Sequence, residues 1–330
     1  METYNILNSI SSIKNNYNLN FKGKIIDAHV HCGQWNYDKF SCENVIDFFS
    51  KKFNNGKDYV DRVIISNLDC IKNGKNNKPL KDEINGNLLL LKAAIKNKKF
   101  IPFVVCQPGH GSAENIEILL NKYPDIIKGF KFHPACLGLA ANDVRYIPYM
   151  KLAEKYNKPC LFHSEVLSDE AGNILRNGIS DPDFIYETAK QFPNVPVILG
   201  HMGLGGDKAH KVGINTLLKS IENDDAKLYA DLAWVDWDNP TKPNIIYVID
   251  KLLHTPKGDM TSRLLFGTDA PLGVFGEKAL KQQGAYDANI RNIKNAIKNN
   301  FGADANTLIS RIFYRNSKKL LNKQNINLTD

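Results

Sequence analysis

The sequence contains no long apolar run, no dense cysteine framework and no signal-like N-terminus, and each absence excludes a class of protein. No segment approaches the roughly 18 apolar residues that a membrane-spanning helix needs, so we expect no membrane partner. The six cysteines include no CxxC pair, which predicts free thiols in a reducing compartment. The chain does not open with a basic segment followed by an apolar one, so we expect a cytoplasmic protein without a signal peptide.

The formal charge of +8 is spread along the chain rather than gathered into a basic tract. Lysines alternate with acidic residues, and no interleaving of aromatic and basic residues occurs. The sequence therefore predicts a solvated surface and no nucleic-acid partner. With 43% hydrophobic residues among 330, the chain can fill a sizeable core.

Short apolar segments alternate with stretches of helical periodicity along most of the chain. Ile116, Leu119 and Leu120 form one helical stripe, and Ile84, Leu88, Leu91 and Ile95 form another. The pair Asp181-Pro182 marks a helix start, with an aspartate cap and proline in the first turn. The apolar segments number eight: Lys24–His31, Asp61–Leu68, Phe100–Pro108, Ile126–Pro134, Lys158–Glu165, Val195–Gly203, Lys227–Trp234 and Arg263–Pro271.

Eight strands that alternate with helices predict an α/β fold, specifically a (β/α)8 TIM barrel. The main alternative is a doubly wound open sheet, which usually has fewer strands and a glycine-rich phosphate turn after the first. Here the first segment ends in His31-Cys32-Gly33-Gln34 instead. We predict an N-terminal arm over residues 1–20 and a barrel domain over residues 21–330.

Residues able to bind a metal stand at the ends of several predicted strands. His29 and His31 are spaced i, i+2 on a strand, so their rings point to the same side. His163 and Asp269 end two later segments, and the strand ends of a barrel meet at one face. A histidine of this kind, taken alone, is more often a packing residue. Together, three imidazoles and one carboxylate suit zinc or a similar divalent ion with an open coordination position.

Three further residues at strand ends keep more than one interpretation. His201 could bind a second metal or act as an uncoordinated acid or base. The ammonium of Lys131 could reach solvent, pair with a substrate carboxylate, or be carboxylated and bridge two metals. His133 shares a face with Lys131 and could shape only the following turn.

Residues beside the histidine pair have supporting interpretations. Asp27 faces the same way as His29 and could orient a ligand histidine through a hydrogen bond. Cys32 points the opposite way from His31, so we interpret it as structural. Aromatic residues just past the first and seventh strands could line a pocket for a flat substrate: Trp35, Tyr37, Trp234 and Trp237.

Five motifs in this order resemble those of the amidohydrolase superfamily. Within it, the chain is similar to the amidohydrolase-related group that contains aminocarboxymuconate semialdehyde decarboxylase. The motifs are Asp27-Ala28-His29-Val30-His31, Gly129-Phe130-Lys131-Phe132-His133-Pro134, Phe162-His163, Gly200-His201-Met202-Gly203 and Gly267-Thr268-Asp269-Ala270-Pro271.

The resemblance implies a metal-dependent barrel enzyme. It implies His201 as the catalytic histidine and Asp269 as a proton shuttle in addition to a ligand. It implies one divalent ion, with zinc as the first choice, and a second ion only if Lys131 is carboxylated. The implied metal ligands are His29, His31, His163 and Asp269.

The first function hypothesis is hydrolysis of a carbonyl or lactone group in a small-molecule substrate by metal-activated water. The alternative is metal-dependent, non-oxidative decarboxylation of a small dienoic or aromatic acid. A third hypothesis is a barrel that has lost activity and serves as a binding protein. The resemblance is compatible with a homodimer.

Overall fold

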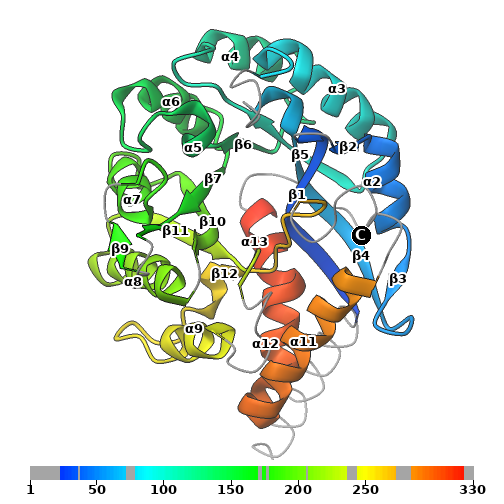
Figure 1. Ribbon diagram of the computed structural model, residues 1–330, viewed down its shortest axis with the longest axis vertical. Coiled ribbons are helices and arrows are strands. Elements are labelled where there is room, and N and C mark those ends of the chain that lie inside the picture. Colours follow the sequence, from blue (N-terminus) through cyan, green and yellow to red (C-terminus); the bar gives the residue numbers. More distant parts are fainter. Residues whose placement is uncertain are drawn as a thin grey trace, which may run out of the picture.

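The fold is known from a computed structural model that describes residues 23–35, 38–71, 79–169, 173–175, 178–205, 207–235, 244–272 and 284–322. The predicted arm over residues 1–20 lies outside this part of the chain, as do Tyr37 and Trp237. The described residues form a ring of parallel strands with helices on its outside (Figure 1).

Each of the eight apolar segments overlaps one strand of the ring. The sheet runs in chain order from the first of these strands to the last, and every adjacent pair along it is parallel. The strands are β1 (Lys24–Trp35), β4 (Asp58–Asn67), β5 (Phe100–Val105), β6 (Gly129–Phe132), β7 (Cys160–Glu165), β10 (Pro196–Leu204), β11 (Lys227–Asp231) and β12 (Leu264–Leu265).

Backbone hydrogen bonds join the two ends of the sheet. The amide of Ala28 donates to the carbonyl of Phe266 at 2.8 Å, and the amide of His31 donates to that of Ala270 at 2.7 Å. The sheet is therefore closed, which an open doubly wound sheet is not. The predicted (β/α)8 barrel is confirmed.

Helices follow most of the barrel strands and cover their outer faces (Figure 1). The start of α7 is as predicted, because Asp181 accepts a hydrogen bond from the amide of Asp183 and Pro182 stands in the first turn. No helix within the described segments has the length and apolarity needed to cross a bilayer. The α-helices are α2 (Cys42–Phe49), α3 (Glu83–Lys96), α4 (Ala113–Lys122), α5 (Pro134–Leu137), α6 (Ile147–Lys155), α7 (Pro182–Lys190), α8 (Asp207–Asn223), α9 (Asn244–Leu253), α11 (Gly284–Phe301), α12 (Ala305–Ser310) and α13 (Asn316–Asn322).

The predicted apolar stripe on α3 is wrong in part. Ile95 is 53% exposed, whereas Asn87 is fully buried. The Asn87 side chain donates to the carbonyl of Val105 at 2.9 Å and accepts from its amide at 2.9 Å. These bonds to the last residue of β5 turn the helix so that a polar side chain faces the barrel.

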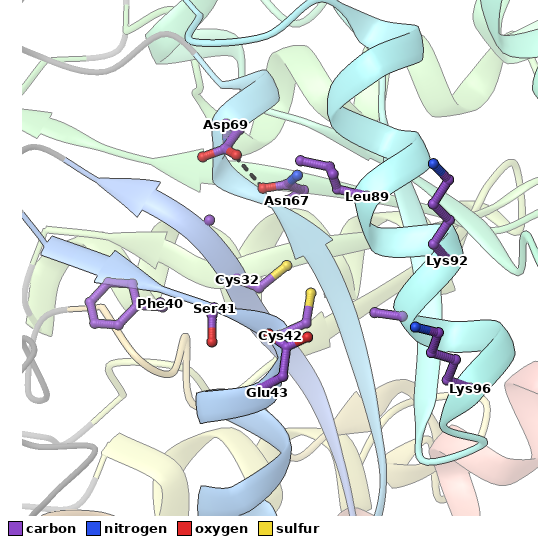
Figure 2. A pocket seen from close by; sticks show the side chains of 12 residues that line it. Cys32, Phe40, Ser41, Cys42, Glu43, Asn67, Asp69, Leu89, Lys92 and Lys96 are labelled. Atoms are coloured by element: carbon purple, nitrogen blue, oxygen red, sulfur yellow. Dashed lines mark hydrogen bonds between the residues drawn. The ribbon is translucent and has the colours of Figure 1, made fainter.

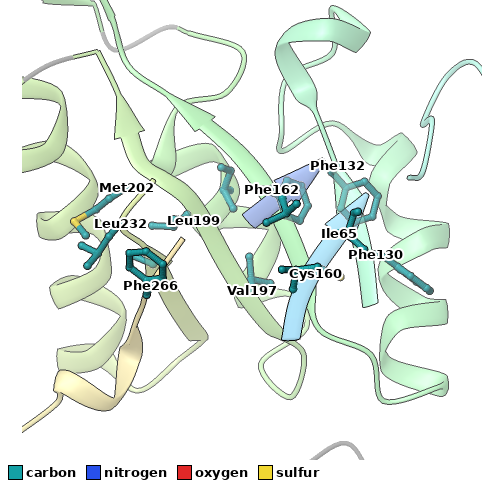
Figure 3. Close-up of a cluster of buried hydrophobic side chains, with 14 of the residues drawn as sticks. Ile65, Phe130, Phe132, Cys160, Phe162, Val197, Leu199, Met202, Leu232 and Phe266 are labelled. Atoms are coloured by element: carbon teal, nitrogen blue, oxygen red, sulfur yellow. The ribbon is translucent and has the colours of Figure 1, made fainter. Parts of the chain in front are cut away.

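The core has two layers, one inside the barrel and one between the barrel and its helices. Figure 3 shows the outer layer, in which side chains such as Phe132 and Phe162 pack with ring centroids 4.5 Å apart. The inner layer includes Phe103 and Leu161, together with Leu320 and Leu321 from α13. Helix α13 lies across the middle of the ring in Figure 1, so it contributes to filling the barrel.

Beyond the barrel, the end of β1 pairs with a short antiparallel strand. Gly33 pairs with Phe40 of β2 (Asp38–Phe40), and Ser41 then caps α2 through a hydrogen bond from the amide of Asn44. A cavity of about 280 Å³ lies among β1, α2 and α3 (Figure 2).

Candidate active site

The candidate residues occupy the carboxyl ends of the barrel strands, where active sites of (β/α)8 barrels lie. All of them except the half-buried His133 are at most 8% exposed. Burying so many polar groups is costly unless they find partners, so their contacts define the site. His29 and His31 lie on β1, Lys131 on β6, His163 on β7 and His201 on β10, and Asp269 follows β12.

The Asp269 carboxylate is the negative centre of the cluster. Its Oδ1 lies 2.9 Å from Nε2 of His31 and 3.5 Å from Nε2 of His29. Its Oδ2 accepts a hydrogen bond from Nε1 of Trp234 at 2.9 Å. Burial opposes ionisation of Asp269, but His201 and the two β1 histidines hold its pKa well below the usual value. Asp269 is therefore an anion held by positive or polar neighbours on both oxygens.

The ring of His29 is fixed on both sides. Nζ of Lys131 lies 2.9 Å from Nε2, and a carboxylate oxygen of Asp231 lies 2.9 Å from Nδ1. Because an ammonium can only donate, we assign the proton of the neutral ring to Nδ1, which donates to Asp231. The Nε2 lone pair thus faces Lys131 and Asp269. Gly200 leaves room for this ring, since a Cβ there would lie 3.0 Å from Cε1 of His29.

Lys131 is inside the site, so the interpretation in which its ammonium reaches solvent is wrong. The side chain is fully buried, and burial lowers its pKa to about 8, while Asp269 and Asp231 act in the opposite direction. The amine therefore remains largely protonated at neutral pH and places a cation beside His29.

The donor set fits a divalent metal ion. Burial lowers the pKa of His29, His31 and His201, so these imidazoles are neutral and have lone pairs to donate. Ligand atoms of His29, His201 and Asp269 all lie within 4.8 Å of one another. Nδ1 of His201 is buried and makes no hydrogen bond within the described part of the chain, so it is available either to a metal or to a substrate.

The backbone of His201 is held in an unusual conformation. His201 and Met202 have φ values of +64° and +49°, in the left-handed region that non-glycine residues rarely adopt. The amide of His201 donates to Asp231 at 2.9 Å, and the amide of Gly203 donates to Ser164 at 2.9 Å. These bonds maintain a strained turn that aims the His201 ring, and strain of this kind gathers at functional sites.

Two more histidines form one wall of the site. The rings of His133 and His163 stack with centroids 4.0 Å apart and an interplanar angle of 10°. Trp35 also stacks on His133, with centroids 6.0 Å apart, and Glu165 approaches Nε2 of His163 at 3.7 Å. His133 also accepts a hydrogen bond from the amide of Cys136 as the cap of α5. It therefore shapes the turn and contributes an aromatic surface at once.

Asp27 does not make the predicted hydrogen bond to the ring of a ligand histidine. The Asp27 carboxylate accepts from the backbone amide of His29 at 3.2 Å and from the hydroxyl of Thr268 at 2.6 Å. Burial raises the pKa of Asp27 to about 7. Its contacts tie β1 to the segment after β12, and the ring of His29 is oriented by Asp231 instead.

Asp231 is the residue that the sequence analysis missed. It ends β11, is fully buried, and accepts from the His29 ring and from the amides of His201 and Ala233. The sequence contains a pattern that could have identified Asp231, because it lies inside the seventh apolar segment just as Asp269 lies inside the eighth. A buried carboxylate at a strand end requires a partner, and here the partner is a candidate ligand.

A closed (β/α)8 barrel with imidazoles and one carboxylate at its carboxyl end has the architecture of a barrel enzyme. A profile of the family described as amidohydrolase matches residues 85–323, which is more than half of the chain. The chain therefore belongs to the amidohydrolase family. Its members include hydrolases and decarboxylases. Among curated proteins, none matches this sequence.

Solved structures show the same fold at low sequence identity. A probable 2-pyrone-4,6-dicarboxylic acid hydrolase from Acinetobacter baumannii, with citric acid bound, is 15% identical, with a TM-score of 0.56 over 90% of this chain and 99% of that one. The 5-carboxyvanillate decarboxylase from Novosphingobium aromaticivorans, complexed with manganese and 4-hydroxy-3-methoxy-5-nitrobenzoic acid, is 14% identical, with a TM-score of 0.55 over 90% and 96%. The IDCase of Metarhizium anisopliae is 14% identical, with a TM-score of 0.57 over 91% and 97%.

Proposed function

We propose that this protein is a metal-dependent hydrolase that acts on a carbonyl or lactone group of a small molecule. The observation that carries the proposal is the Asp269 carboxylate, which contacts both β1 histidines within a cluster of neutral imidazoles. Histidine nitrogens and one carboxylate form the usual donor set of catalytic zinc, which keeps an open position.

The proposed cofactor is one divalent ion, with zinc as the first choice. When bound, the ion would acidify a water molecule and polarise the substrate carbonyl. A second ion would require Lys131 to be carboxylated. The proposed ligands are His29, His31, His163 and Asp269.

The chain's own residues supply the proton transfers. Asp269 accepts a proton from the attacking water and returns it to the leaving group. The hydrogen bond from Trp234 to Oδ2 fixes the orientation of this carboxylate. His201 donates a hydrogen bond to the developing oxyanion, a role that its unpartnered Nδ1 supports. Lys131 and His133 are candidates for binding the substrate.

Lys131 also favours a second candidate function, the non-oxidative decarboxylation of a dienoic or aromatic acid. A buried ammonium in the site can pair with a substrate carboxylate. Assays on a panel of small lactones, esters, amides and unsaturated or phenolic acids distinguish the two functions. Ring opening or bond hydrolysis without gas supports the hydrolase, and release of labelled CO2 supports the decarboxylase.

Metal removal is expected to abolish activity. Protein purified without added metal should contain about one zinc per chain by elemental analysis, since a single catalytic ion occupies such a site. Dialysis against a chelator should reduce turnover to the uncatalysed rate, and zinc or manganese should restore it. Protein that contains no metal and gains no activity from either ion would favour the binding-protein hypothesis.

Asp231→Asn is expected to weaken metal binding by about 10–100-fold, the usual effect of losing the partner of a ligand histidine. An amide accepts the Nδ1–H bond less well than a carboxylate does, so the ring is less firmly held with Nε2 toward the site. The measurement is calorimetric titration of the metal-free protein with zinc. Asp224→Asn is the control, because the Asp224 side chain is 82% exposed. Equal affinities in the two variants would contradict the assigned role.

A further inference from the structure

Two thiols lie together just outside the candidate active site. Cys32 follows His31 on β1 and Cys42 is the first residue of α2. Figure 2 shows their sulfur atoms side by side at the cavity among β1, α2 and α3, and each thiol shifts the pKa of the other. The interpretation of Cys32 as purely structural leaves this contact unexplained.

The local fold brings these cysteines together. Gly33 of β1 pairs with Phe40 of β2, so the residues on either side of this pair run antiparallel and close. Ser41 then begins α2, and Cys42 stands at its first position. The contact therefore belongs to a tight, capped hairpin-to-helix turn and does not depend on a distant loop.

Cys42 has the surroundings of a reactive thiol. It is only partly buried and sits at the amino end of a helix, where backbone N–H groups stabilise an anion. Lys92 and Lys96, both exposed, line the same cavity. The neighbouring Cys32 thiol lowers the pKa of Cys42, although burial opposes the shift.

The three buried cysteines outside this pair differ from Cys42 in exposure and in the direction of their pKa shift. Cys70, Cys106 and Cys160 are at most 1% exposed, and burial raises the pKa of each. Thiols of this kind react slowly with oxidants and alkylating reagents. An oxidant that reaches the protein should therefore attack Cys42 first, and Cys32, itself 1% exposed with a raised pKa, would react only as the partner thiol beside it.

We propose that Cys42 and Cys32 form a modification site at which a peroxide converts two thiols into a disulfide. The Cys42 thiolate attacks one peroxide oxygen, so an S–O bond forms, the O–O bond breaks, and the leaving hydroxide takes up the proton lost by Cys42 to become water. The Cys32 sulfur then attacks the Cys42 sulfur, so the S–S bond forms, the S–O bond breaks and a second water leaves. The thiols lose two electrons and two protons, and the peroxide is reduced to two waters.

The cysteine pair lies beside the proposed metal centre, so its oxidation would affect that centre. Cys32 is bonded to His31, and a disulfide would tie the strand that carries His31 to helix α2. The inference itself does not depend on the proposed function, because it rests on the two thiols and their cavity.

Peptide mapping of the full chain tests the proposal. Lys39 lies between the cysteines, so trypsin releases them on separate peptides, residues 25–39 and 40–51. After treatment with stoichiometric hydrogen peroxide we expect these peptides to be joined, and to separate on reduction. In untreated protein, Cys42 should react with a thiol reagent about tenfold faster than the buried cysteines.

Variants make the test specific. Cys136 is the other partly buried cysteine among the described residues, so Cys136→Ser should keep the joined peptides. Cys32→Ser should leave Cys42 as a sulfenic acid that dimedone traps. Overoxidation of Cys42 in the parent protein with Cys32 still free, or a cross-link to a different cysteine, would overturn the proposal. The parent protein alone decides between these outcomes if a variant does not fold.

Discussion

Replacing Asp269 by asparagine is expected to lower kcat by roughly two to four powers of ten, the usual contribution of a positioned proton-transfer group. The substitution keeps the size of the side chain and its capacity to accept a hydrogen bond from Trp234. It removes the anion that contacts His29 and His31 and can take a proton. Turnover is measured on whichever compound of the substrate panel the parent protein converts, and the metal content of the same sample is determined.

The control for this prediction is Asp250→Asn on α9. The Asp250 side chain is 58% exposed and belongs to a helix between β11 and β12 rather than to a strand end, so this change should leave kcat unaltered. Reduced turnover with unchanged metal content assigns Asp269 to proton transfer, whereas loss of both assigns it mainly to holding the ion. Undiminished turnover in Asp269→Asn would exclude the proposed mechanism.

Replacing Phe103 by alanine is expected to reduce the free energy of unfolding by about 3–5 kcal/mol. Phe103 is fully buried inside the barrel. Its ring packs on the backbone of Gly129, where an added Cβ would lie 2.5 Å from the ring. The barrel strands cannot close around the cavity that the ring leaves, so the loss of unfolding free energy should approach about 5 kcal/mol. Because a domain has only about 5–15 kcal/mol of stability, this is a large fraction of the total.

Urea denaturation followed by circular dichroism measures this effect. Ile118→Ala on α4 is the control, since Ile118 is 55% exposed and its loss leaves no buried cavity. We expect the midpoint of Phe103→Ala to fall well below that of the parent and that of Ile118→Ala to change little. Equal midpoints would mean that the barrel interior repacks around the missing ring.

Strand positions were readily predicted from the sequence because buried parallel strands are apolar on both faces. Each of the eight segments overlaps a barrel strand, and the stripe of Ile116, Leu119 and Leu120 lies on the buried face of α4. Helix α3 shows the limit of this reasoning. The pattern there favoured apolar positions, but the hydrogen bonds of Asn87 to Val105 decided which face is buried.

Candidate site residues were predicted wherever a polar residue interrupts the end of an apolar segment. This signal identified His29, His163 and Asp269, but it was not applied to Asp231. The partner of each residue could not be predicted, because hydrogen bonds between strands depend on register. Asp231 and Lys131 reach opposite nitrogens of His29 from strands that are far away along the chain.

The sequence by itself therefore determined the kind of protein: an alternation of strands and helices, with side chains able to bind a metal at the strand ends. Those features depend on local periodicity and on the cost of burying a polar residue, both of which can be read along the chain. Only the tertiary structure decided that Lys131 is buried, that Asp231 orients His29 and that Cys32 meets Cys42. Those contacts arise from barrel closure and from one turn, which bring side chains together through geometry that periodicity does not contain.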